Sequence, residues 1–250
     1  MILAAQLYTL RDYLKTPEGI KESLKKVRDI GYTSVQVSGI GPIESNELKK
    51  IVDDLGLTIC ATHIGYNRFK EDLNNVIKDH LIYGCKYVGL GSLPTEFRNE
   101  DGFRNFAKEF SEIGKELKKH GSQFVYHNHH FEFEKYNGKT AFDIILDESS
   151  KEDFGILLDT YWVQAGGADP VYWIHKLKGR MGVIHFKDMV IRNEKQEFAE
   201  VGHGNMNWGP IIEACYETGI EYVAIEQDTC LGDPFESLKM SYEFLKDKIK

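Results

Sequence analysis

The sequence predicts a single-domain (β/α)8 TIM barrel over residues 1–250, on three observations. The length of the chain matches the usual size of that fold. A short apolar segment followed by an amphipathic segment repeats about every thirty residues, and a glycine directly follows four of the amphipathic segments. A doubly wound open sheet is the alternative, but no glycine-rich phosphate loop follows the first apolar segment. A closed parallel barrel is therefore the favoured fold.

Eight segments are predicted as strands because they are short and rich in aliphatic or aromatic residues. Most of them lack strict alternation with polar residues, which is typical of parallel strands that are covered on both faces. They are residues 3–8, 34–38, 58–63, 87–90, 123–128, 156–159, 182–186 and 222–226.

The amphipathic segments between them are predicted as helices. Residues 17–30 start after Thr16, which suits an N-cap, and Pro17 suits the first helical position. Ile20, Leu24 and Val27 then fall on one helical face. The four predicted helices that end at a glycine are 17–30, 44–55, 101–120 and 209–218, followed by Gly31, Gly56, Gly121 and Gly219.

Composition narrows the class of protein. The formal net charge is −8 and no basic run occurs, which argues against a nucleic-acid partner because nucleic-acid binders neutralise phosphates with Lys and Arg. No apolar run is long enough to span a membrane, and residues 1–8 resemble a first strand more than a signal peptide. The four cysteines have no disulfide or zinc-ribbon spacing, so a cytoplasmic protein is expected. A homo-oligomer is left open.

Acidic and imidazole side chains stand at the ends of several predicted strands. Asp159 and Glu226 each end an apolar run, and His185 lies in another. A fourth run, residues 123–134, carries several histidines and glutamates at its end. In a parallel barrel the carboxyl ends of all strands meet at one rim, so these side chains should converge there. Two acids with one or two imidazoles in one pocket predict a divalent-metal site.

The same segments resemble a known family. The motifs are Gln6-Leu-Tyr-Thr-Leu-Arg-Asp, Tyr126-His-Asn-His-His-Phe-Glu-Phe, Leu158-Asp-Thr-Tyr-Trp, His185-Phe-Lys-Asp, Val201-Gly-His-Gly and Ile225-Glu. Their order and content are similar to the sugar phosphate isomerase/epimerase family, the xylose isomerase-like TIM-barrel group. The resemblance covers almost the whole chain, and it is less specific for the reaction than for the superfamily.

The resemblance implies one divalent metal ion (Mn²⁺, Zn²⁺, Co²⁺ or Mg²⁺) held by Glu, Asp, His and Glu from strands five to eight. Asp159, His185 and Glu226 match the last three ligands. Where many relatives have Glu-Asn-His at the first, this chain has His127-Asn-His. Either His127 replaces the glutamate, which is the favoured interpretation, or Glu132 reaches back to the metal.

The implied substrate is a keto sugar or related polyol, isomerised or epimerised through an enediolate. Glu226 is one candidate base, and its partner is Glu132, His129 or His127. Lys187 is expected to polarise a carbonyl or to hold a phosphate. Because the usual strand-five Glu is missing, β-elimination by a lyase suits the residues as well. The residues expected to contact substrate are Gln6, Tyr8, Gln36, His63, Trp162 and His203.

Several of these residues have a structural alternative. Trp162 stands where family members often have a histidine, and it suits stacking on a sugar or packing at the barrel rim equally well. His80, His120 and His175 fall within or at the ends of predicted helices and are expected on the surface or as caps.

Two other functions remain as alternatives. Apurinic-site endonucleases share the barrel, but they need three metals and more ligands than this chain offers. A non-catalytic sugar-binding barrel, or one subunit of a heteromeric enzyme, is the second alternative, because the first metal ligand is altered.

Overall fold

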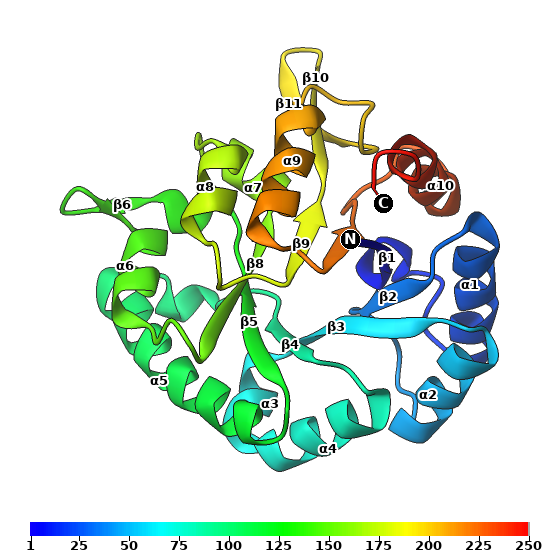
Figure 1. Ribbon diagram of the computed structural model, residues 1–250, viewed down its shortest axis with the longest axis horizontal. Helices are drawn as coiled ribbons and strands as arrows, with labels where there is room; N and C mark the ends of the chain where they lie inside the picture. The colour runs from blue at the N-terminus through cyan, green and yellow to red at the C-terminus, as the bar shows by residue number, and fades with distance from the viewer. Residues whose placement is uncertain (250) are drawn as a thin grey trace.

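Eight parallel strands close into a barrel in the computed structural model, which describes residues 1–249 (Figure 1). Around the barrel the order is β1-β12-β9-β8-β5-β4-β3-β2, so every strand pairs in parallel with its neighbours. The predicted (β/α)8 TIM barrel is confirmed. The barrel strands are β1 (Ile2–Gln6), β2 (Ser34–Val37), β3 (Thr58–Ile64), β4 (Tyr87–Leu90), β5 (Gln123–His127), β8 (Phe154–Asp159), β9 (Val183–Phe186) and β12 (Tyr222–Ile225).

Helices connect the strands and surround the barrel (Figure 1). Two connections, those after β3 and β8, contain two α-helices each. The α-helices are α1 (Pro17–Ile30), α2 (Ser45–Asp54), α3 (Tyr66–Glu71), α4 (Leu73–Tyr83), α5 (Glu100–Lys119), α6 (Ala141–Glu148), α7 (Thr160–Ala165), α8 (Pro170–Lys176), α9 (Trp208–Thr218) and α10 (Pro234–Leu245). Short 3-10 helices are η1 (Leu7–Leu10), η2 (Thr95–Phe97) and η3 (Phe131–Phe133).

The predicted ends of helix 17–30 are confirmed, and those of 44–55, 101–120 and 209–218 agree with the structure to within one residue. Thr16 caps α1 by accepting a hydrogen bond from the Gly19 amide at 3.2 Å. Gly219 ends α9 in the left-handed conformation, with φ of 81°. A residue with a side chain would be strained there, which explains why glycine stands at this boundary.

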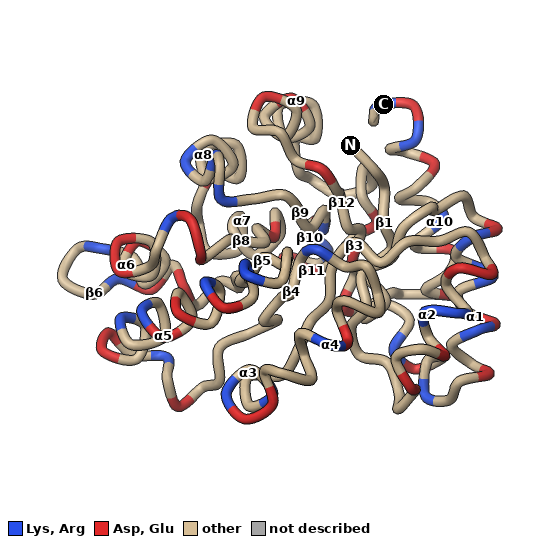
Figure 2. Tube along the Cα trace, turned by 60° about the horizontal axis from the view of Figure 1, so that its bottom comes forward, with Lys and Arg blue, Asp and Glu red and all other residues tan. Residues whose placement is uncertain are grey.

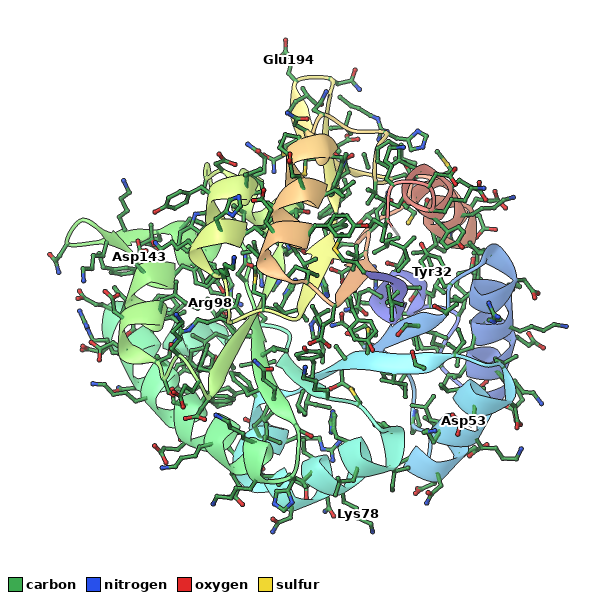
Figure 3. All side chains as sticks on the ribbon, viewed as in Figure 1. Tyr32, Asp53, Lys78, Arg98, Asp143 and Glu194 are labelled. Carbon is green, nitrogen blue, oxygen red and sulfur yellow. The ribbon has the colours of Figure 1, made fainter. Side chains whose placement is uncertain are left out.

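Two antiparallel hairpins interrupt the strand–helix repeat, and the sequence analysis did not predict them. They are β6 (Lys135–Tyr136) with β7 (Lys139–Thr140), and β10 (Asp188–Arg192) with β11 (Lys195–Ala199). The second hairpin begins two residues after β9 and extends away from the barrel, with Glu194 at its tip (Figures 1 and 3). Asn193 and Glu194 turn the chain there with positive φ angles of 49° and 64°.

Two apolar cores hold the barrel. Inside the barrel, small and medium side chains such as Ala4, Ala61 and Ala224 pack around Tyr87. Gly182 leaves room for the Tyr87 ring, because a Cβ at this position would lie 1.8 Å from the tyrosine oxygen. The larger core fills the layer between strands and helices, where a cluster of phenylalanines surrounds Phe110 and Phe124.

The outer faces of the helices carry mixed charge (Figure 2). Acidic and basic side chains alternate there, for example in the exposed pairs Lys49–Asp53 and Lys50–Asp54 on α2. Within residues 1–249, no helix is long and apolar enough to cross a membrane.

One prediction about the helices is wrong. His80 is buried, and its ring nitrogens lie 2.6 Å from the Val76 carbonyl oxygen and 2.7 Å from Thr62 Oγ1. It therefore ties α4 to β3 instead of lying on the surface. His120 and His175 are exposed, as expected.

Candidate metal centre

Four side chains converge at the carboxyl-terminal rim of the barrel, and all four are buried. They are His127 at the end of β5, Asp159 at the end of β8, His185 in β9 and Glu226 directly after β12. One potential ligand atom from each lies within 4.8 Å of those of the others. The geometry thus brings together the set His127, Asp159, His185 and Glu226, contributed by four adjacent strands.

The backbone at the strand ends orients the carboxylate of Asp159. Its Oδ1 accepts a hydrogen bond from the Trp162 amide at 3.1 Å and so caps α7. Its own amide donates to Asn128 Oδ1 at 2.9 Å. With Oδ1 engaged, Oδ2 faces His127 Nε2 at 3.2 Å and His185 Nδ1 at 3.6 Å. The residue is a helix cap and a candidate ligand at the same time.

Hydrogen bonds behind the two imidazoles set which ring nitrogen faces the cluster. His127 Nδ1 lies 2.9 Å from the Gly91 carbonyl oxygen, and His185 Nε2 lies 2.8 Å from Gln36 Oε1. Both partners are acceptors, so each of these nitrogens carries a proton. His127 Nε2 and His185 Nδ1 then have free lone pairs in the neutral rings, which is the arrangement of a metal-ligating histidine with its outer hydrogen bond.

These lone pairs point at carboxylate oxygens. His185 Nδ1 is 3.1 Å from Glu226 Oε2, and His127 Nε2 is 3.2 Å from Asp159 Oδ2. Two acceptors at such distances repel each other unless a proton or another cation lies between them. Burial lowers the pKa of His185, but the carboxylates of Glu226 and Asp159 outweigh it and leave this pKa raised. The four donors fit a divalent ion with mixed nitrogen and oxygen ligands.

A lysine supplies one positive charge to the same cluster. The Lys187 ammonium is buried and lies 3.0 Å from Asp159 Oδ2 and 2.7 Å from Glu226 Oε2. It also lies 2.7 Å from Oδ2 of a third acid, Asp228. Burial raises the pKa of Asp159 and Glu226, yet Lys187 and the imidazoles outweigh it and hold both well below the usual range. Three carboxylates thus share one ammonium, and a dication would balance the remaining charge.

A cavity of about 360 Å³ opens over the cluster, a size that suits a small ligand. His127, Glu226 and Lys187 form part of its wall, together with Asp228 at its mouth. The remaining lining residues include Tyr8, Ser38, His63, Tyr66, Ser92 and His129.

Two further imidazoles in the cavity wall are uncharged. Burial lowers the pKa of His63 well below its usual value, and the neighbouring His127 and His185 lower it further. Burial and His127 act on His129 in the same direction. His63 Nε2 and His129 Nδ1 are buried and lack a hydrogen-bond partner. Because both residues line the cavity, these nitrogens are groups that a bound ligand would satisfy.

Glu132 lies apart from the cluster. Its two carboxylate oxygens accept hydrogen bonds from the Tyr126 hydroxyl at 2.5 Å and from the His129 amide at 2.9 Å. The residue is fully buried and does not line the cavity. The structure therefore brings His127, and not Glu132, to the other three candidate ligands. Glu132 instead holds the turn that carries His129.

The predicted substrate residues divide into three groups. Tyr8 and His63 line the cavity. Gln6 and Gln36 lie behind it, where Gln6 Nε2 is 3.5 Å from His63 Nδ1 and Gln36 supports His185. His203 is exposed in the loop between β11 and α9 and does not line the cavity.

Trp162 belongs to an aromatic cluster at the rim. Its ring lies 5.2 Å from the rings of His129 and His130 and 5.9 Å from that of Phe198 in the β10–β11 hairpin. It does not line the cavity, so the structure agrees with rim packing.

Asp228 is a cavity residue that had not been predicted from the sequence. This residue lies in a loop, two positions beyond Glu226. Arg11 donates a hydrogen bond to its backbone carbonyl oxygen at 2.9 Å, so the carboxylate is not used in that contact. The only sequence signal for Asp228 as a site residue is that it is an acid two positions after a strand-end glutamate, and this signal is weak.

Residues 24–248 match the family described as Xylose isomerase-like TIM barrel. The chain belongs to this family. It is 24% identical to an inosose dehydratase of Lacticaseibacillus casei, over 58% of this chain and 54% of that protein. It is 23% identical to an inosose dehydratase of Clostridium beijerinckii, over 91% of this chain and 89% of the relative. This chain therefore spans about half of the first relative and most of the second.

Two solved structures have the same fold. A sugar phosphate isomerase/epimerase from Parabacteroides distasonis superposes with a TM-score of 0.81 and is 26% identical, covering 98% of this chain and 93% of that one. The IOLI protein with a zinc atom bound superposes with a TM-score of 0.73 over 99% of this chain and 97% of its own, at 13% identity. The chain is thus similar to enzymes that are named as dehydratases, isomerases and epimerases.

Proposed function

We propose that the protein is a metal-dependent enzyme that removes a proton beside the carbonyl of an uncharged keto sugar or related polyol, and so isomerises or epimerises it. One observation carries the proposal: Glu226 belongs both to the buried ligand cluster and to the wall of the cavity, and the Lys187 ammonium, 2.7 Å from it, lines the same wall. A substrate in the cavity would therefore meet an acid–base pair at the metal centre itself.

We infer that His127, Asp159, His185 and Glu226 hold one divalent ion. Two imidazoles with two carboxylates suit Mn²⁺, Zn²⁺ or Co²⁺ better than Mg²⁺, which prefers oxygen ligands. When bound, such an ion acts as a Lewis acid toward a carbonyl and an adjacent hydroxyl of the substrate. The zinc bound to the IOLI protein supports this inference without extending to the identity of the metal here.

The chain's own residues supply the proton transfers. Glu226 is the candidate base for the carbon-bound proton, because it is the ligand carboxylate that lines the cavity. The Lys187 ammonium, 2.7 Å from Glu226, is placed to donate a hydrogen bond to the oxygen that gains negative charge. His63 and His129 each offer a nitrogen without a partner and are candidates for binding substrate hydroxyls.

The charges around the cavity favour a substrate without phosphate. The Lys187 ammonium has three acidic partners. The arginines near the rim are bonded elsewhere: Arg11 to backbone carbonyls of Tyr8 and Asp228, and Arg98 to Leu93 and Ser92. Within residues 1–249 the cavity wall has no other cationic side chain, so an anion would not be balanced.

Dehydration is the second candidate reaction. Epimerisation by two bases needs a second carboxylate on the opposite face of the substrate, but Glu132 is bonded to Tyr126 and His129 outside the cavity. One base with Lys187 as a nearby acid suits the loss of water from a keto-cyclitol or keto sugar. The similarity to inosose dehydratases points the same way.

Deuterium exchange in D₂O tests the proposal. The Mn²⁺-loaded protein is incubated with a panel of unphosphorylated keto sugars and keto-cyclitols, and NMR follows the proton beside the carbonyl. We expect exchange with at least one compound, with Glu226→Gln inactive and the exposed Glu236→Gln unchanged. An epimer or isomer among the products supports the first reaction, and a conjugated enone supports dehydration. Absence of exchange across the panel would reject enolisation.

Metal analysis separates this proposal from the other functions. About one ion per chain is expected for the four-ligand cluster. A sugar-binding barrel without a metal predicts none, and a three-metal nuclease predicts three. The net charge of −8 further disfavours nucleic acid as substrate.

A further inference from the structure

Lys187 contacts three acidic side chains. Its ammonium contacts the two candidate ligands through Asp159 Oδ2 and Glu226 Oε2, and it also contacts Asp228 Oδ2. The first two oxygens are the same atoms that face His127 Nε2 and His185 Nδ1. The third belongs to a residue that is absent from the ligand cluster.

A divalent ion and the ammonium would compete for those two oxygens. An ion bound by the cluster would lie about 2.0–2.2 Å from each carboxylate oxygen. The ammonium, at 3.0 and 2.7 Å from the same oxygens, would then be a close like-charged neighbour in a buried site. Repulsion between buried cations is weakly screened. Lys187 in its present contacts therefore opposes binding of the ion.

Asp228 offers the ammonium another partner. Its side chain is 28% exposed at the cavity mouth, whereas those of Asp159 and Glu226 are buried. Its backbone is fixed, because Arg11 donates to its carbonyl oxygen at 2.9 Å and the amide of the preceding Gln227 donates to Thr9 Oγ1 at 3.0 Å. The ammonium already contacts Asp228 Oδ2 at 2.7 Å, and the flexible lysine stem lets it keep this contact while it moves off Asp159 and Glu226 without movement of the backbone.

We propose that Asp228 is a positioning residue that draws Lys187 away from Asp159 and Glu226 when a divalent ion binds, which turns the ammonium toward the substrate cavity. The inference rests on the proposed metal centre and adds a coupling between its occupancy and the position of the lysine. Binding of the ion thereby places the proton donor for the reaction.

A double-mutant cycle on Mn²⁺ affinity tests the coupling, with free Mn²⁺ measured by EPR and no substrate present. We expect Lys187→Met to bind Mn²⁺ about tenfold more tightly, because the competing cation is gone. Asp228→Asn should bind about tenfold more weakly, because Lys187 then stays on the ligand carboxylates. In the Lys187→Met background, Asp228→Asn should change the affinity by less than about threefold, which is the coupling that the cycle isolates.

An exposed ion pair provides the control. Lys50 and Asp54 lie 2.6 Å apart on α2, and Lys50→Met and Asp54→Asn should leave Mn²⁺ affinity unchanged. Circular dichroism checks that each variant folds. If Lys187→Met does not fold, the comparison of Asp228→Asn with Asp54→Asn decides, and equal affinities would overturn the inference.

Two results contradict the coupling. Unchanged or weaker binding by Lys187→Met would mean that the lysine supports the ligands instead of competing with the ion. An equal effect of Asp228→Asn in both backgrounds would mean that Asp228 acts on the ion directly. If the wild-type protein binds Mn²⁺ and the variants give either result, only this inference is lost. If the wild-type protein binds no divalent ion, the metal centre is lost as well.

Discussion

His185 and Gln36, which are 149 residues apart in the chain, meet through a 2.8 Å contact between Nε2 and Oε1. The contact fixes the ring so that Nδ1 faces Asp159 and Glu226. Strand β2 thus orients a candidate ligand that strand β9 carries. Both residues are fully buried, so no water replaces this hydrogen bond if the glutamine is lost.

Gln36→Leu is therefore expected to weaken metal binding by about 10- to 100-fold, as losses of outer hydrogen bonds to ligating histidines do. The measurement is Mn²⁺ affinity by calorimetry. The matched control is Gln164→Leu, because Gln164 is exposed on α7 and should tolerate the change. Equal affinities for the two variants would contradict the role assigned to Gln36.

The buried carboxyl of Glu132 predicts a pH-dependent stability. Burial raises its pKa from 4.5 to about 7, although hydrogen bonds from Tyr126 and the His129 amide oppose this rise. Below pH 4.5 the carboxyl is protonated in both the folded and the unfolded chain, and its burial has no ionisation cost. As the pH rises toward 7, the unfolded chain loses the proton first, so the folded state loses stability.

Glu132→Gln has no such titration. Its amide oxygen can still accept from the His129 amide, and its NH2 group can donate to the Tyr126 oxygen, which reverses that hydrogen bond. The free energy of unfolding of this variant should rise relative to wild type by about 3 kcal/mol between about pH 4.5 and pH 8. Urea denaturation in the presence of EDTA measures the difference. A difference that does not change with pH would show that folding does not raise the pKa of Glu132.

Gly204 packs against a buried carboxylate that organises the loop before α9. Asp188 accepts hydrogen bonds from the amides of Gly202, Gly204 and Met206, and from the indole of Trp208 at 2.6 Å. A Cβ at position 204 would lie 2.3 Å from Asp188 Oδ1 and 2.4 Å from the Met189 carbonyl oxygen.

Gly204→Ala should therefore lower the stability by about 1–3 kcal/mol, since neither neighbour can move freely. Thermal unfolding provides the measurement. Gly209→Ala is the matched control, because a Cβ there meets nothing within 4 Å and alanine favours the helix. A loss of stability in both variants, or in neither, would argue against a specific clash at Asp188.

Thiol reactivity should distinguish Cys230 from the other cysteines. Burial raises the pKa of Cys60 to about 12, and it raises those of Cys85 and Cys215 strongly as well. These three side chains are buried, whereas Cys230 is half-buried. We expect a thiol reagent to modify one cysteine in the folded protein and four after denaturation. Cys230→Ser should remove the reaction of the folded protein, and persistence of that reaction would contradict the burial of the others.

Much of the barrel could be predicted from local patterns. Strand segments covered on both faces are continuously apolar, and glycines mark helix ends because they adopt positive φ without strain. Asp159, His185 and Glu226 stood out because strand ends in a parallel barrel share one rim. The two hairpins were missed because their strands interrupt the repeat and pair only with each other, β6 with β7 and β10 with β11.

The sequence by itself determined the barrel and placed Asp159, His185 and Glu226 at its rim, because these follow from periodicity and chain direction. It placed the end of the first strand at Tyr8, whereas β1 ends at Gln6 and Tyr8 lies in η1. Only the tertiary structure placed His127, and not Glu132, beside the other three candidate ligands, since Tyr126 and the His129 amide hold Glu132 elsewhere. It also brought Asp228 to Lys187 across 41 positions and buried His80 against Thr62. Such contacts depend on distances between residues far apart in the chain, and no local pattern encodes them.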